Sequence, residues 1–316
     1  MTNNLEPIEY AYLETTNHCN LRCSFCNRED VIGPLKHMPI EKWETLLSKI
    51  SHYPIKEAKL MGMGEPMLHP KFDEITKMFK ETFPDSFVIV ATNCQYTINQ
   101  GSKMRARFEN CLKYLDMIYL SIDGFEENYE RDRSPAKWSR LIKFLDEFKT
   151  IDRSNCNVVV NYVVNKYNVY DIPKIEKLVE KYDLGELRIN IAQIWDPSTK
   201  IEDDDRTWGY GRDQLDYLKK NYLSNIKGRA SWTWSDCFWV KKGLYVTVEG
   251  NVKVCCMNTA ADSIGNIFIQ DLEKIRQSQA YQKISTGCST NKPSEHCKNC
   301  SYSELSPLLQ ELGIKN

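Results

Sequence analysis

The chain has 316 residues, of which 41% are hydrophobic and 27% are charged. This composition excludes disordered and collagen-like proteins and predicts one substantial domain plus a small one. The 42 Lys and Arg residues nearly balance the 43 Asp and Glu residues, and the formal net charge is -1. Nucleic-acid binding is therefore disfavoured, because no overall positive charge is available to attract phosphates.

No apolar run approaches the roughly 18 residues that a membrane-spanning helix needs. Residues 1–6 lack the basic and apolar parts of a signal peptide. We therefore expect a cytoplasmic protein without membrane contact. The chain has 12 cysteines, which are not expected to form structural disulfides in a reducing compartment. The number of cysteines therefore indicates metal binding or redox chemistry.

From residue 8 to about 194, short β-branched runs alternate with amphipathic helical patterns. The predicted strands are 10–14, 57–63, 86–92, 117–122, 157–164 and 186–192. The predicted helices are 40–51, 71–82, 100–113, 137–149 and 171–182. Strands separated by helices form parallel sheets with right-handed crossovers. Because six such units are two short of a complete eight-stranded barrel, we predict an α/β fold with a partial TIM-like (β/α)6 barrel over residues 1–194.

The composition changes at residues 195–236, which we interpret as an aromatic-rich linker with one helix at about 212–226. Beyond it, residues 244–248 and 252–255 flank Gly250 and predict a β-hairpin. A helix at about 271–284 and a cysteine-rich tail complete a small second domain over residues 237–316. The tryptophans of this stretch, which could stack on a sugar ring or pack between domains, are Trp195, Trp208, Trp232, Trp234 and Trp239.

Cys19, Cys23 and Cys26 follow the first predicted strand in the order Cys-x-x-x-Cys-x-x-Cys. Three thiolates on one short loop can bind three irons of a [4Fe–4S] cluster, because soft sulfur ligands suit iron–sulfur chemistry. A fourth ligand is missing nearby, which leaves one iron open to a small molecule, as a catalytic cluster requires. A zinc site would need a fourth Cys or His, and His18 is awkwardly placed for that role beside Cys19.

This cysteine motif, with the aromatic Phe25 before its last cysteine, resembles that of the radical S-adenosylmethionine (SAM) superfamily. The resemblance extends over most of residues 8–194. Gly62-Met63-Gly64-Glu65 resembles the Gly-Gly-Glu motif that holds the SAM amino group, with Met63 in the middle position. Thr92-Asn93-Cys94 resembles the Thr-Asn-Gly of the family, with Cys94 where glycine is usual.

Two more positions extend the resemblance. Ser121 lies in a segment that faces the SAM ribose in the family, and Arg133 lies where relatives often carry an arginine for the SAM carboxylate. Arg133 also ends a dense charge run and could equally be a solvated surface charge. The SAM-contacting residues that the resemblance implies are Phe25, Gly62, Gly64, Glu65, Asn93, Ser121 and Arg133.

The resemblance implies how such a site works. SAM binds the open iron through its amino and carboxylate groups, and one electron cleaves it to methionine and a 5'-deoxyadenosyl radical. This radical removes hydrogen from an unactivated carbon. The resemblance also implies a flavodoxin or ferredoxin as the electron donor.

Cys237, Cys255, Cys297 and Cys300 form a second set. We predict that the turn at Gly250 brings Cys237 and Cys255 together on neighbouring strands. Four thiolates make a closed site, which a zinc ribbon would satisfy as well. The spacing resembles SPASM/twitch auxiliary-cluster domains, which begin with Cys-x(9–15)-Gly-x4-Cys. The cysteine count resembles the shorter form in 2-deoxy-scyllo-inosamine dehydrogenase-like twitch enzymes and implies one auxiliary [4Fe–4S] cluster.

Five cysteines remain outside both sets. Cys111 and Cys156 are predicted to be packed small hydrophobic residues. Cys256 follows the predicted ligand Cys255 and points to the opposite face of its predicted strand. It is a candidate hydrogen donor to a substrate radical, or a buried residue without a role. The sequence leaves the roles of Cys94 and Cys288 open, as it does the oligomeric state.

The main prediction is a radical SAM oxidoreductase or epimerase that acts on a small sugar- or cyclitol-like molecule. A fully ligated auxiliary cluster can accept the second electron of a dehydrogenation, whereas epimerisation needs a donor such as Cys256 or Cys94. The first alternative is a peptide maturase of the RiPP or sulfatase type. It is disfavoured here because the first strand begins at about residue 9, which we take to leave no room for a peptide-recognition domain. The second alternative, a non-enzymatic electron-transfer protein, would gain nothing from an open iron.

Overall fold

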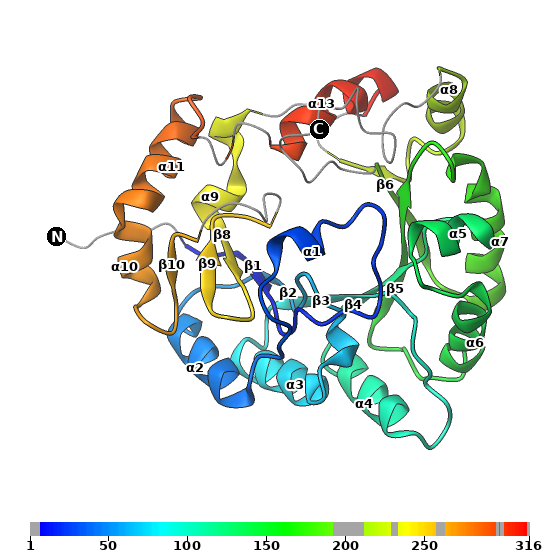
Figure 1. Ribbon diagram of the computed structural model, residues 1–316, viewed down its shortest axis with the longest axis horizontal. Coiled ribbons are helices and arrows are strands. Elements are labelled where there is room, and N and C mark those ends of the chain that lie inside the picture. The colour runs from blue at the N-terminus through cyan, green and yellow to red at the C-terminus, as the bar shows by residue number, and fades with distance from the viewer. Residues whose placement is uncertain are drawn as a thin grey trace.

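The computed structural model describes residues 7–191, 212–228, 233–256, 263–294, 297 and 300–314. Within these residues the chain forms a ten-stranded sheet with helices outside it (Figure 1). Six parallel strands occur in the predicted order and form the predicted partial barrel. They are β1 (Tyr10–Leu13), β2 (Glu57–Lys59), β3 (Phe87–Thr92), β4 (Met117–Ser121), β5 (Asn157–Val164) and β6 (Glu186–Ile191).

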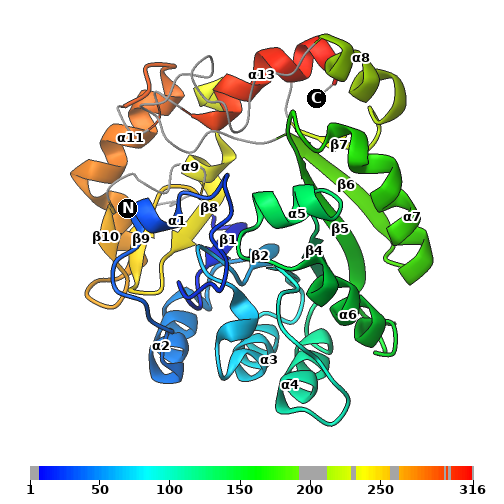
Figure 2. The ribbon, with the colours of Figure 1, turned by 45° about the vertical axis from the view of Figure 1, so that its right-hand side comes forward.

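An outer layer of helices follows the strands, and both views of the ribbon show it (Figures 1 and 2). Its members are α2 (Ile40–Ile50), α3 (Phe72–Thr82), α4 (Lys103–Leu112), α6 (Trp138–Phe148) and α7 (Ile172–Tyr182). Helix α2 buries Trp43, Leu46, Leu47 and Ile50, as their helical spacing predicts. The sequence missed α1 (Arg28–Val31) and α5 (Glu127–Asp132), because helices this short show no periodic pattern.

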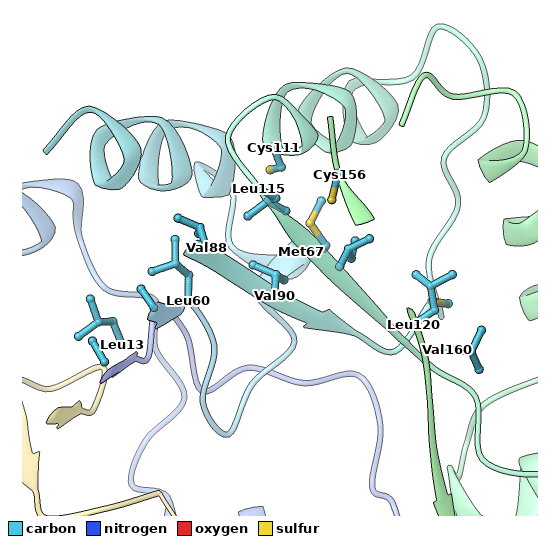
Figure 3. Packing of buried hydrophobic residues seen from close by; sticks show 14 of the residues in the cluster. Leu13, Leu60, Met67, Val88, Val90, Cys111, Leu115, Leu120, Cys156 and Val160 are labelled. Atoms are coloured by element: carbon cyan, nitrogen blue, oxygen red, sulfur yellow. The ribbon is translucent and has the colours of Figure 1, made fainter. Parts of the chain in front are cut away.

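The two faces of the barrel sheet differ in polarity. The face toward the helices carries the main hydrophobic core, including Leu60, Val88 and Leu120 (Figure 3). Cys111 and Cys156 are buried in this core, as predicted. The inner face has only a small cluster of Ile89, Tyr119 and Val159 among the described residues. Because the barrel interior is not filled by apolar side chains, it can hold a site.

The C-terminal hairpin extends the barrel sheet. Strand β8 (Gly243–Val246) pairs in parallel with β1, and β9 (Asn251–Lys253) returns antiparallel to it. Strand β10 (Gly265–Asn266) follows β9, and β7 (Ile226–Lys227) pairs with β6 at the opposite edge. The predicted hairpin is confirmed, but its position beside β1 was not predicted. A partial barrel leaves both edge strands open, and such edges accept further strands.

The remaining helices lie in two groups, one beside this hairpin and one toward the opposite edge of the sheet (Figure 1). They are α8 (Arg212–Asn221), α9 (Phe238–Lys242), α10 (Leu272–Gln277), α11 (Gln279–Ser289) and α13 (Ser301–Leu312). The helix predicted at 271–284 is broken at Ser278, whose side chain accepts a hydrogen bond from the Tyr281 amide and so begins α11. Trp195, Trp208 and Trp232 lie outside the described residues. No described helix is long and apolar enough to cross a membrane.

Candidate active site

The first cysteine loop runs from the end of β1 to α2 and lies over the barrel (Figure 1). Its three thiols influence one another electrostatically; burial raises the pKa of Cys23 to about 12, although Arg133 opposes this. No three His, Cys, Asp or Glu side chains in the described ranges converge on one metal ion. Three thiols on one loop suit a cluster, because each can bind a different iron.

Backbone hydrogen bonds attach this loop to its surroundings. The Glu65 amide donates to the His18 carbonyl at 2.7 Å. The Arg22 amide donates to Ser134 at 2.6 Å, and the Ser24 amide donates to Asp132 at 2.9 Å. The loop is thus fixed both to the segment after β2 and to the segment around α5, so the barrel sets its position.

The glycines of the Gly62-Met63-Gly64 segment are required by close packing. A Cβ at Gly64 would lie 2.3 Å from the Thr16 carbonyl oxygen, and one at Gly62 would lie 2.6 Å from the Glu14 side chain. Met63 instead uses its backbone, because its amide donates to the Glu14 carboxylate at 2.6 Å. A side chain at position 63 is therefore tolerated, which explains the departure from the family motif.

Glu65 connects the segment after β2 to the end of β3. Its carboxylate accepts hydrogen bonds from the Thr92 hydroxyl at 2.8 Å, the Asn93 amide at 2.7 Å and the Met67 amide at 3.2 Å. Burial raises the pKa of Glu65 to about 7, although these donors lower it. The side chain is thus engaged by the chain itself, and Glu65 acts as a positioning residue. Its predicted contact with SAM stays a prediction.

Asn93 and Cys94 lie at the end of β3. The Asn93 side-chain amide donates to Asn20 at 2.8 Å and lies 3.8 Å from the Cys19 sulfur. Cys94 has φ 60, which explains why glycine is usual here in the family. Cys94 is fully buried in the main core and does not line the cavity described below, so its position is unsuited to hydrogen donation. Ser121 is the last residue of β4 and is buried beside Cys94.

Arg133 is not a solvated surface charge. It is 6% exposed and pairs with the fully buried Asp123. Burial alone would lower the pKa of Arg133, but the Asp123 carboxylate raises it well above its ordinary value. Its guanidinium lies 3.9 Å from the Cys23 sulfur and 5.5 Å from the centre of the Phe25 ring. Arg133 therefore lies beside Cys23 and Phe25 of the first cysteine loop, and the contacts predicted between these two side chains and SAM stay predictions.

A cavity of about 450 Å³ opens between the two cysteine regions. Phe25 and Cys26 line it from the first loop, Gly62 and Met63 from the segment after β2, and Cys256 from the second region. The remaining lining residues come mainly from the inner face of the sheet. They are Tyr12, Asn27, Lys59, Met61, Ala91, Tyr119, Asn161, Val163, Arg188, Asn190, Ile191 and Tyr245. A substrate in this cavity would meet the first cysteine loop and Cys256 together.

Cys256 lines the cavity for a different reason from the one predicted. Strand β9 ends at Lys253, so Cys255 and Cys256 follow the strand, and strand alternation does not set their directions. The thiol of Cys256 instead hydrogen-bonds with the Tyr12 side chain of β1. The pairing of β8 with β1 brings this segment to the barrel, a contact that sequence spacing alone does not show.

The second cysteine set comes from separate elements of the chain. Cys237 begins α9 and is not on a strand, so the predicted pairing of Cys237 and Cys255 on neighbouring strands is wrong. The reason is that Phe238–Lys242 form a helix before β8. Cys237 lies close enough to Cys297 and Cys300 for electrostatic coupling. Cys255 lies near Tyr245.

Cys288 is a member of this region that the sequence analysis left without a role. It is buried, and its sulfur lies 4.0 Å from that of Cys297. The indole of Trp234 donates to the Cys297 carbonyl at 2.9 Å. Cys288 is on α11 and lies nine residues before Cys297, a spacing that matches no motif considered above.

Curated relatives of the chain include enzymes of nucleotide and peptide chemistry. A GTP 3',8-cyclase from Chlorobaculum tepidum is 23% identical over 208 residues, which are 65% of this chain and 58% of that protein. The antilisterial bacteriocin subtilosin biosynthesis protein AlbA from Bacillus subtilis is 25% identical over 306 residues, 91% of this chain and 63% of that protein. The chain thus spans less than two thirds of the length of both relatives.

Solved structures share the fold. SuiB from Streptococcus suis, bound to S-adenosylmethionine, has a TM-score of 0.68 at 15% identity, covering 97% of this chain and 72% of that chain. BtrN in complex with AdoMet and 2-DOIA has a TM-score of 0.56 at 16% identity, covering 94% of both chains.

The comparison with family models agrees with the two cysteine regions. Residues 13–179 match the radical SAM superfamily, and residues 237–301 match SPASM, an iron–sulfur cluster-binding domain. The first match contains the three-cysteine loop, the glycine segment and Arg133, and the second contains all four cysteines of the second set. The chain therefore belongs to the radical SAM superfamily and carries a C-terminal SPASM domain.

Proposed function

We propose that this radical SAM enzyme oxidises a peptide, with SAM as its co-substrate. The observation that carries the proposal is the position of the cavity, which is lined from both the first cysteine loop and the SPASM region. The relative AlbA supports a peptide substrate, since it matches 91% of this chain, through both cysteine regions. Membership of the family brings a SAM-binding [4Fe–4S] cluster and an auxiliary iron–sulfur cluster as cofactors.

The residues around the first loop fit this cofactor. Cys19, Cys23 and Cys26 would hold three irons of the first cluster, and the cradle at Gly62 and Gly64 has no room for a Cβ. When bound, the first cluster and SAM supply a 5'-deoxyadenosyl radical that takes a hydrogen atom from the substrate. Cys26 is exposed at the loop, so a bound substrate would have to complete the exclusion of water around this reactive species.

The second set would hold the auxiliary cluster. Its chain ligands would be Cys237, Cys255, Cys297 and Cys300, and four thiols leave no open coordination position. A cluster with such a closed set of ligands could accept an electron from the substrate radical that remains after hydrogen abstraction. We include in the proposal that this domain holds one auxiliary cluster and that a flavodoxin or ferredoxin supplies the first electron.

A second candidate is the oxidation of a small polyol, such as a sugar or an aminocyclitol. Two observations favour it. The cavity, at about 450 Å³, is lined by hydrogen-bonding groups such as Tyr12, Asn161 and Asn190, and BtrN, solved with 2-DOIA, covers 94% of both chains. Epimerisation belongs to the same candidate, with Cys256 as the hydrogen donor.

The test uses anaerobically reconstituted protein with dithionite and SAM, and it measures 5'-deoxyadenosine and methionine. We expect both products from the wild-type chain and neither from a variant with Cys19, Cys23 and Cys26 changed to Ala. Continued 5'-deoxyadenosine formation by that variant would refute the proposed function.

A second assay separates the two substrate classes. Synthetic peptides rich in Cys, Ser and Asp are compared with a panel of hexoses and aminocyclitols. The readouts are a rise in 5'-deoxyadenosine above the substrate-free level and the loss of two hydrogen masses from the product. Oxidation of a peptide supports the main proposal, whereas oxidation of polyols alone would replace it by the second candidate. A product with unchanged mass and solvent hydrogen at carbon would indicate epimerisation.

A further inference from the structure

The charges that line the cavity are of one sign. In the described part of the chain, Lys59 and Arg188 are its charged lining residues, and no described Asp or Glu lines it. Both side chains come from barrel strands, β2 and β6, and therefore from the rigid part of the fold. A positive cavity with fixed walls favours a negatively charged ligand.

Arg188 has no carboxylate partner among the described residues. Its Nη1 donates to the Tyr119 hydroxyl at 2.7 Å, and its guanidinium lies 5.6 Å from the centre of the Tyr119 ring. These contacts orient the group without neutralising it. The guanidinium has five N–H donors in a fork that matches a carboxylate or a phosphate, so donors are left for a ligand.

The contrast with Arg133 sharpens this point. Arg133 lies at the cysteine-loop side of the site, and its charge is compensated by the buried Asp123. Arg188 sits opposite Asn161 in the register of β5 and β6. The Asn161 side chain accepts a hydrogen bond from Asn190 at 2.7 Å, so further polar groups surround Arg188. Two arginines in one barrel thus have different electrostatic roles.

Lys59 is a weaker second cation. Its Nζ lies 3.5 Å from a Glu57 oxygen, which partly compensates its charge. The same Nζ lies 5.0 Å from the centre of the Tyr12 ring, and Tyr12 in turn contacts Cys256. Lys59 is therefore on the SPASM side of the cavity, whereas the charge of Arg188 is not compensated by any carboxylate of the described ranges.

We propose that the substrate enters this cavity with an oxyanion, a carboxylate or a phosphate, that binds Arg188, with Lys59 assisting. The proposal rests on the proposed function and specifies its substrate. In a peptide the group is an acidic side chain or a terminal carboxylate. In a small molecule it is a carboxylate or a phosphate ester. A bidentate pair with Arg188 fixes the substrate in the barrel, which positions its reacting carbon near the first cysteine loop.

The experiment measures binding of three probes to the anaerobic holoenzyme with SAM by calorimetry. The probes are glutarate, glycerol 3-phosphate and the neutral glutaramide. We expect one of the anions to bind the wild-type chain, and glutaramide not to. Binding of that anion is expected to weaken by about 10-fold or more in Arg188→Gln, and to recover partly in Arg188→Lys. Glutarate binding identifies a carboxylate as the source, and glycerol 3-phosphate binding identifies a phosphate.

Control variants keep the result interpretable. Arg22→Gln removes an exposed arginine outside the cavity and should leave anion binding unchanged. Lys59→Gln should weaken binding less than Arg188→Gln, and it serves if Arg188→Gln does not fold. Binding of neither anion to the wild-type chain would overturn the inference. Equal anion binding by the wild-type chain and Arg188→Gln would overturn it as well. A rise in the KM for SAM in Arg188→Gln as large as the loss of anion binding would also overturn it, because it would assign the arginine to SAM.

The substrate-free cleavage of SAM separates this inference from the proposed function. If the wild-type chain cleaves SAM but anion binding does not depend on Arg188, the inference alone fails. If the wild-type holoenzyme forms no 5'-deoxyadenosine, the proposed function fails, whatever the anions do.

Discussion

The two cysteine regions differ in how far the chain has already organised the groups around the sulfurs. At the first loop, donors from the barrel approach the thiols: Asn93 is 3.8 Å from the Cys19 sulfur and Arg133 is 3.9 Å from that of Cys23. At the second set, the contacts include other cysteines: the Cys288 and Cys297 sulfurs are 4.0 Å apart, and Cys237 is coupled electrostatically to Cys297 and Cys300. The first site is built by the strands, whereas the second depends more on its own metal to bring its thiols together.

The difference follows from where the ligands lie in the chain. The first three cysteines share one loop, which is attached by its backbone to neighbouring strand ends. The second set draws on α9, the end of β9 and the segment before α13, which are separate elements. Ordering separate segments costs conformational entropy that a metal cluster can offset.

The largest expected effects come from removing one cluster ligand from each cysteine region. We expect Cys23→Ala and Cys297→Ala each to lower the iron content from about eight to about four per chain. Cys23→Ala should abolish SAM cleavage with little change in proteolytic sensitivity. Cys297→Ala should retain substrate-free SAM cleavage but make the residues after β8 more sensitive to protease, because the second region loses its organising metal. Cys288→Ala is the matched control, and it should keep about eight irons.

Equal protease sensitivity of the Cys23→Ala and Cys297→Ala chains would contradict this view of the two regions. Loss of iron from Cys288→Ala would instead make Cys288 a ligand of the second set.

The second prediction concerns the buried ion pair beside the first loop. Arg133→Gln leaves the fully buried Asp123 carboxylate without its partner. We expect a loss of about 3–5 kcal/mol in the free energy of unfolding by urea. The control is Arg22→Gln, whose side chain is 75% exposed and pairs with Glu29, and it should cost under about 1 kcal/mol.

A double variant, Asp123→Asn with Arg133→Gln, should recover part of the lost stability, because it removes the unpaired charge. An Arg133→Gln chain as stable as Arg22→Gln would show that the first loop does not depend on this pair.

Most of the barrel could be predicted from the sequence because its signals are local. The alternation of β-branched runs and amphipathic helices determined all six barrel strands, and the Cys-x-x-x-Cys-x-x-Cys spacing located the first loop. The placement of β8 beside β1 could not be predicted, because an open sheet edge leaves no mark in the sequence. Arg188 and Lys59 were missed for a related reason. Each is a single charged residue within a strand, and only the folded, curved sheet shows that both side chains line the same cavity.

The third prediction tests the packing that fixes the first loop. Gly64→Ala would place its Cβ 2.3 Å from the Thr16 carbonyl and 2.6 Å from the His18 carbonyl. Because backbone atoms must move, we expect a loss of about 1–3 kcal/mol in stability together with a lower iron content at the first site. Gly33→Ala in the same loop is the control, since its Cβ would meet only Glu249 at 3.5 Å. Full iron in Gly64→Ala would show that the loop is less rigid than its contacts indicate.

The smallest expected effect is a loss of stability at low pH that begins at the first cysteine loop. His37 stacks on His18 with ring centres 4.4 Å apart and meets His69 at 5.1 Å. Burial, and then the neighbouring His69 and His18, lower the pKa of His37 from 6.5 to about 4. The unfolded chain therefore binds more protons than the folded chain between these values. The stability that neutral His37 contributes is present above pH 6.5 and is lost as the pH falls toward 4.

We expect His37 to contribute a loss of about 1 kcal/mol, discounted because the ring is partly exposed to solvent, measured as the difference between wild type and His37→Gln in the fall of urea stability from pH 7 to pH 5. His37→Gln keeps a polar side chain beside the Thr16 hydroxyl, which lies 2.8 Å from the His37 ring nitrogen, but it cannot titrate in this range. Its stability should therefore fall less over the same interval. Because His37 contacts Thr16 and His18 beside the first cysteines, limited proteolysis at pH 5 should show loosening near α1 in the wild type. Parallel pH profiles of the two chains would remove His37 as a source of acid sensitivity and leave the first loop rigid throughout.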